Sequence, residues 1–86
     1  MQKLREKFAA HLSLPKEIAL DLPLITLTGR REVIIENYKN ISEFSETAIR
    51  VRTKEGEVTV TGERLVLQQI TSEILLITGR VGGIKW

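Results

Sequence analysis

The sequence predicts a mainly β domain, an antiparallel meander of β-hairpins forming a small sandwich, roll or barrel, with a short N-terminal helix. Three observations lead to this fold class. From residue 24 onward the chain is rich in β-branched residues, which favour strands. Over residues 49–67 apolar and polar residues alternate, the period of a strand with one buried face. The dipeptide Thr-Gly also ends three apolar stretches, at positions 28–29, 61–62 and 78–79.

Residues 1–22 are predicted to form a helical lead, and residues 23–86 the β-domain. Apolar residues recur every four positions in the lead, as on one face of an amphipathic helix; they are Leu4, Phe8 and Leu12. Two interpretations stay open: the helix packs against the sheet, or residues 1–14 contact a membrane surface peripherally through their basic side chains. Pro23 ends the lead, because the residue before a proline favours extended backbone.

The first strands are predicted to pair as a hairpin that turns near Arg30 and Arg31. Residues 36–40 are polar and contain two asparagines, which suit a turn or a bulge. A further short strand then carries Ile41 and Phe44 and ends in a turn at residues 45–46.

Residues 49–67 are predicted to form a three-stranded meander with two-residue loops at residues 55–56 and 62–63. Val51 then pairs with Val60, and Val60 with Leu65. Glycine in each loop suits the turn types that join two strands tightly. This register places every apolar residue on one face and the basic row Arg50, Arg52 and Lys54 on the other.

The chain is predicted to turn again at residues 69–72 and to end in a pair of strands, 74–78 and 81–86, joined at residues 79–80. Gly82 and Gly83 indicate a bulge or a close approach of backbones. The nearly regular spacing of the Thr-Gly dipeptides also admits a short β-solenoid, a repeat fold that favours end-to-end polymers. Two-residue turns favour the antiparallel meander.

Composition excludes several classes of protein. The sequence has no cysteine, so it holds neither disulfides nor a cysteine-rich zinc site. The net charge is +2, with basic and acidic residues interleaved, which does not point to nucleic acid. No apolar run approaches the roughly 18 residues of a membrane-spanning helix, and no signal peptide is visible. We therefore expect a soluble, cytoplasmic protein.

The sequence offers no catalytic constellation. His11 is the single histidine and has no partner at metal-ligand spacing. A cysteine nucleophile, a glycine-rich phosphate loop and an acidic metal cluster are all missing. We expect no enzyme activity, no metal and no cofactor.

The basic row Arg50, Arg52 and Lys54 supports a second function class, a small nucleic-acid-binding β module. Phosphate contacts are one explanation of the row, and pairing with Glu57 on the neighbouring strand is the other. The few aromatic residues do not interleave with the row, as a platform for single-stranded nucleic acid requires.

Four segments in order, LDLPLITLTG (20–29), VIIENYKNISEFS (33–45), IRVRTKEGEVTVTGERLVL (49–67) and ILLITGRVGGIKW (74–86), resemble the YabP/YqfC sporulation family, and most closely its YqfC branch. The positions that carry the resemblance are Pro23, Gly29, Ile35, Glu36, Asn37, Gly56, Gly62 and Gly79. Two positions depart from the family pattern: Tyr38 stands where His is more usual, and Trp86 where Tyr or Phe is.

The resemblance implies a non-enzymatic protein of the mother-cell cytoplasm, peripheral at the forespore membrane, that helps to build the spore envelope or coat. It implies a membrane-anchored sporulation protein as partner and supplies no catalytic residues. A homo-oligomer is a further expectation. The candidate interface is the last strand, with Ile84 and Trp86 at a sheet edge; the charged face with Arg50 and Arg52 is the competing surface.

Overall fold

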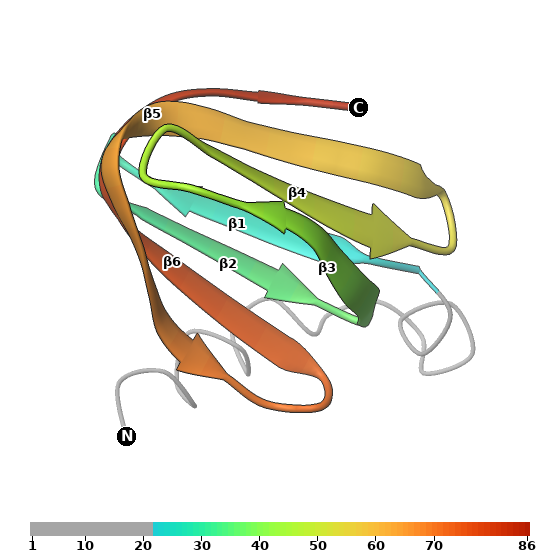
Figure 1. Cartoon of the computed structure of the whole chain (residues 1–86). Helices are drawn as coiled ribbons and strands as arrows, with labels where there is room; N and C mark the ends of the chain where they lie inside the picture. Colours follow the sequence, from blue (N-terminus) through green and yellow to red (C-terminus); the bar gives the residue numbers. More distant parts are fainter. Residues whose placement is uncertain (1–21) are drawn as a thin grey trace.

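A computed structural model describes residues 22–86 as an all-β domain (Figure 1). The strands are β1 (Leu24–Thr28), β2 (Glu32–Glu36), β3 (Tyr38–Phe44), β4 (Ala48–Thr53), β5 (Gly56–Ile70) and β6 (Ile74–Lys85). The predicted N-terminal helix falls in residues 1–21, which lie outside the described residues.

The six strands form one open sheet in the order β1-β2-β6-β5-β4-β3. All five neighbouring pairs are antiparallel. The mainly β, antiparallel prediction is therefore confirmed, and the β-solenoid alternative is wrong, because the coils of a solenoid stack in one direction. Hairpin turns explain only one of the three Thr-Gly dipeptides, at residues 28–29, because the other two lie within β5 and β6.

The sheet folds over on itself because β5 and β6 are long, bent strands that run through both of its halves (Figure 1). We call the half with β1, β2 and the beginning of β6 the lower layer. The lower layer also holds the end of β5, and the upper layer holds β3, β4, the beginning of β5 and the end of β6. Side chains from the facing sides of the two layers form a single core of residues, all at most 4% exposed: Val33, Ile35, Ile49, Val51, Val58, Val60, Leu65, Leu75, Ile77 and Val81.

The bends of β5 and β6 lie against each other, and each is made possible by a glycine. A Cβ atom at Gly62 would overlap the carbonyl oxygen of Arg80, and one at Gly79 would lie 2.6 Å from the carbonyl oxygen of Arg64. Arg64 itself has a φ of 54°, in the left-handed region. The two backbones therefore cross at a distance that admits no side chain on either glycine.

The turns predicted at residues 62–63 and 79–80 are wrong, because both strands continue through these positions. At each bend, backbone N–H groups donate hydrogen bonds to carbonyl oxygens in the turn of another hairpin. In β5, Gly62 N donates to Thr47 O at 3.0 Å, and Leu65 N donates to Glu46 O at 2.8 Å. These contacts come from the β3–β4 turn and satisfy groups that would otherwise cost free energy when buried.

The bend of β6 has the matching arrangement. Gly79 N donates to Arg31 O at 3.2 Å, and Val81 N donates to Arg30 O at 2.8 Å. Here the donors meet the β1–β2 turn, which was predicted at these arginines and is confirmed. The two hairpin turns and the two bends thus gather at one end of the molecule (Figure 1).

The β4–β5 hairpin is present, with a register that differs from the predicted one by two residues. Val51 lies opposite Val58, not Val60, and Thr53 lies opposite Gly56. Lys54 forms the loop with the next residue, and neither has a positive φ, whereas Gly56 has a φ of 117°. The loop is therefore not one of the predicted tight turns, which need a positive φ inside the loop. A shift of two residues preserves the side-chain faces, so the predicted buried face is confirmed.

Asn37 makes the connection from the lower to the upper layer. It has a φ of 64°, a conformation that asparagine tolerates better than most residues. Its backbone N donates to Glu73 O at 2.8 Å, and its Nδ2 donates to Leu22 O at 3.0 Å. The polar break predicted over residues 36–40 is narrower in the structure: only Asn37 separates β2 from β3. The register of β3 against β4 shifts twice, first between Tyr38 and Asn40 and then between Ile41 and Glu43.

Glu36, just before this break, has its carboxyl group in an environment that disfavours the charged form. Its Oε2 atom is buried and accepts no hydrogen bond from the described residues. Burial raises the pKa of the Glu36 carboxyl, and the Glu73 carboxylate raises it further. The charged form is thus less favourable in the folded protein than in the unfolded chain, so this group costs stability as the pH rises through its folded pKa.

We expect Glu36→Gln to raise the thermal midpoint at pH 7, because glutamine keeps the shape and removes the charge. The gain should shrink as the pH falls and vanish below 4.5, the usual pKa of glutamate, where both states are protonated. Thermal unfolding followed by circular dichroism over this pH range measures it. Glu55→Gln, at an exposed turn position, is the matched control; a gain of the same size in this variant would contradict the assignment to Glu36.

Candidate interaction surfaces

The C-terminal half of β6 is an edge of the upper layer. β2 pairs with β6 only over residues 74–78, and the β1–β2 turn reaches no further than Val81. Within residues 22–86, the remaining pairings of β6, up to Lys85, are with β5 alone. The structure therefore places the predicted last strand at an edge, even though β6 lies inside the sheet in the lower layer.

This edge carries the two apolar residues named from the sequence. Ile84 is half-buried and packs against the core. Trp86 is 58% exposed, the largest exposed fraction among the exposed large apolar residues of the described chain. The predicted bulge next to them is confirmed, because Gly62 lies opposite Val81 and Thr61 opposite Gly83, which leaves one extra residue in β6.

Trp86 stands between two hollows. One, of about 430 Å³, is lined by Leu22, Pro23, Glu55 and Trp86. The other, of about 570 Å³, is lined by residues of β4, β5 and the end of β6, among them Arg50, Ile84 and Trp86. An exposed indole flanked by depressions offers apolar area with a polar donor, a combination typical of protein interfaces.

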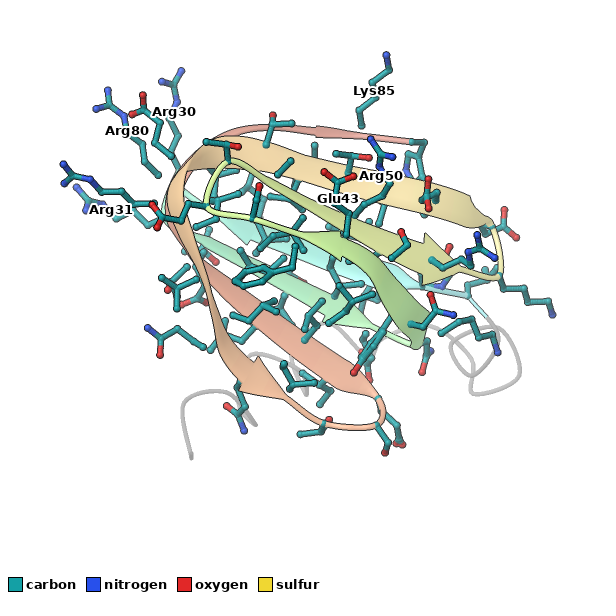
Figure 2. The ribbon with its side chains drawn as sticks, in the orientation of Figure 1. Arg30, Arg31, Glu43, Arg50, Arg80 and Lys85 are labelled. Carbon is teal, nitrogen blue, oxygen red and sulfur yellow. The ribbon has the colours of Figure 1, made fainter. Side chains whose placement is uncertain are left out.

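Arg50 and Arg52 of the basic row lie on the outer face of β4, as predicted, whereas Lys54 lies in the β4–β5 loop. The row is not a free track of positive charge. Arg50 lies between two carboxylates, 3.4 Å from Glu43 Oε1 and 3.8 Å from Glu57 Oε1 (Figure 2). Ser42 Oγ donates to Glu57 Oε2 at 2.8 Å and holds that carboxylate in place. Exposed ion pairs of this kind add little stability. They do, however, neutralise the positive charge of Arg50 that would attract a phosphate group.

Sequence reasoning missed a second set of cations at the bend of the sheet. The side chains of Arg30, Arg31 and Arg80 project outward together there (Figure 2). With Arg64 they line a hollow of about 1050 Å³, whose other walls are Glu46, Thr47, Glu63 and Gly79. A signal was available, since an arginine follows each Thr-Gly dipeptide within two residues.

Most of the positions that carry the family resemblance lie at turns and bends, whereas Ile35 and Glu36 lie in β2. Two of the positions line a hollow: Pro23 beside Trp86 and Gly79 at the bend of the sheet. Gly29 is in the β1–β2 turn with a φ of 55°, and Pro23 precedes β1. Their roles are conformational, as described above for Asn37, Gly56 and Gly62.

Within residues 22–86, no three histidine or acidic side chains gather as metal ligands would. His11 lies outside the described residues. Over the same range, no helix has the length and apolar character needed to cross a membrane.

One open antiparallel β-sheet, with a strand edge at the end of β6 and three surface hollows, defines a small all-β domain over residues 22–86. The chain belongs to the YabP family, whose model matches residues 22–86. It is similar to the uncharacterized protein YqfC of Bacillus subtilis (strain 168), with 32% identity over 75 residues, covering 87% of this chain and 81% of that protein. The predicted family is thereby confirmed. No solved structure matches the chain.

Proposed function

We propose that this protein is a non-enzymatic assembly or adaptor protein of sporulation. It acts in the formation of the spore envelope or coat, in the mother-cell cytoplasm at the forespore membrane. Its partner is a membrane-anchored sporulation protein, bound through the C-terminal edge of β6. Membership of the YabP family and the resemblance to its YqfC branch support a role in sporulation.

The observation that carries the binding mode is the one-sided pairing of the end of β6. A strand with unpaired backbone groups on one side can accept a strand from another chain, and side-chain pockets beside it select the partner. Trp86, with a hollow on either side, provides such a contact. Arg50, by contrast, is already paired with two carboxylates. This pairing favours a protein partner over a nucleic acid whose phosphates would contact the basic row.

The test compares two surfaces of the same layer. The chain truncated after Gly83 and the Trp86→Ala variant should each lose binding to the cytosolic part of the membrane-anchored protein, by about tenfold or more. Arg50→Ala combined with Arg52→Ala should bind nearly as well as the unmodified protein. Isothermal titration calorimetry gives the affinities.

Ile84 packs against the core, so the truncation also removes buried apolar area. Circular dichroism must show that every variant is folded, and Trp86→Ala keeps the test decisive if the truncated chain is not. Loss of the partner in the double arginine variant, with binding retained by Trp86→Ala, would show that the charged face is the interface and that the edge is not.

A further inference from the structure

We propose that the arginine-lined hollow at the bend of the sheet binds an acidic segment of a protein partner. This bend hollow is lined by Arg30, Arg31, Arg64 and Arg80. The bends of β5 and β6 lie at the end of the sheet away from the C-terminus (Figure 1). The inference goes beyond the proposed function, because it assigns a second, independent binding surface with its own ligand chemistry.

The backbone hydrogen bonds of the bend hold the four arginines in one place. Arg30 and Arg31 belong to the β1–β2 turn, and their carbonyl oxygens accept the hydrogen bonds from the bend of β6. Arg64 and Arg80 lie in the two bends, each with its carbonyl oxygen against the glycine of the opposite strand. The bases of all four side chains are therefore fixed, so a ligand meets a formed site rather than four independent chains.

The charges of the hollow are not balanced. It contains four arginines and two glutamates, Glu46 and Glu63. The ion pairs that the structure gives for the described residues join Arg50 to its two neighbours, and none involves the arginines of the bend hollow. Four like charges repel one another, and an incoming carboxylate relieves that repulsion.

The backbone conformation of Arg64 also supports a binding role for its side chain. A residue with a side chain is less stable in the left-handed region than in the usual backbone conformations. Arg64 has a φ of 54°, and glycine or asparagine would fit this position with less strain. A long cationic side chain is nevertheless present, and it lines the hollow.

The shape and the lining of the hollow favour a peptide over other anions. Guanidinium groups bind carboxylates through two parallel hydrogen bonds, which makes arginine well suited to acidic side chains. A volume of about 1050 Å³ accommodates a chain segment, whereas a bilayer is flat. Glu46 and Glu63 repel a continuous row of phosphates, and the lining has no aromatic residue on which bases could stack.

The test measures binding of a fluorescein-labelled peptide of about ten glutamates by fluorescence anisotropy at two salt concentrations. The unmodified protein should bind it, and Arg31→Glu combined with Arg80→Glu should weaken binding by about tenfold or more, because each reversal removes a charged contact and adds repulsion. Lys39→Glu combined with Arg52→Glu changes the net charge equally outside the hollow and should weaken binding by less than about threefold.

Thermal unfolding must show that both double variants fold. Trp86→Ala should keep the peptide, which separates this surface from the edge of β6. No binding by the unmodified protein, or equal losses in the two double variants, would overturn the proposal. Tighter binding of a thymidine oligonucleotide, or of vesicles containing phosphatidylglycerol, at the same salt would overturn it in favour of a nucleic acid or a membrane surface.

Discussion

Gly62→Ala is expected to prevent folding. The added Cβ would overlap the carbonyl oxygen of Arg80, a backbone atom that cannot turn aside like the end of a side chain. The two bends would have to separate, breaking the hydrogen bonds from Gly62 to Thr47 and from Val81 to Arg30. A loss of more than about 4 kcal/mol is expected for such a combination, which is comparable with the stability of a domain of this size.

Circular dichroism and the soluble yield of the Gly62→Ala protein measure this effect. Gly82→Ala is the matched control, since its Cβ would meet no atom closer than 3.5 Å and Gly82 has no positive φ. It should fold with a thermal midpoint near that of the unmodified protein. If Gly62→Ala behaved in the same way, β5 would not pass β6 at this distance, and a hairpin turn at residues 62–63 would again be favoured.

Ile77→Ala is expected to cost about 2–5 kcal/mol, the usual range for removing most of a fully buried aliphatic side chain. Ile77 is completely buried in β6, between Val33 of β2 and Leu67 of β5. The surrounding strands are tied to one another by their ladders, so they cannot move in to fill the cavity. Urea unfolding should show a lower midpoint with an unchanged slope.

The control for this prediction is the same substitution at Ile70, near the end of β5, which is 55% exposed. Ile70→Ala should change the free energy of unfolding by less than about 0.5 kcal/mol. A loss as large as that of Ile77→Ala would mean that another part of the chain or a second molecule covers Ile70, and that the core extends beyond the space between the two layers.

The sequence predicted which side chains are buried better than it predicted which strands pair. The predicted buried face had six residues. Five of them are in the core, namely Ile49, Val51, Val58, Val60 and Leu65, and Leu67 is partly buried and packs against it. Alternation depends only on the extended backbone, and a register error of two residues leaves it unchanged. For that reason the wrong partner predicted for Val51 did not change the predicted core.

The bends could not be distinguished from turns by local sequence. A glycine after a strand is needed both where a chain reverses and where two strands cross closely. What decides between them at Gly62 and Gly79 is the hydrogen bonds to Thr47 and Arg31. Those residues are distant in the sequence, so only the assembled fold shows that the strands continue.

The two candidate sites also differ in how far the sequence predicts them. The edge at Ile84 was predicted, and within residues 22–86 the structure pairs this end of β6 with β5 alone. The sequence shows an arginine after each Thr-Gly dipeptide, but it does not show that these arginines meet, because they belong to three segments that were predicted as three separate turns. Only the folding of the sheet at the bends of β5 and β6 brings Arg30, Arg64 and Arg80 to one surface.

The position of β2 between β1 and β6 has a consequence for the order of folding. β2 can pair with β1 as soon as both have left the ribosome, but its second neighbour is residues 74–78, near the end of the chain. Pairing over such a separation is slow, because the closure of a long loop costs entropy before any contact forms. The pairs β4–β5 and β5–β6 join neighbouring strands and are expected to form before β2 pairs with β6. Until it does, Val33 and Ile35 stay exposed, and in that interval the nascent chain is most open to aggregation or to a chaperone.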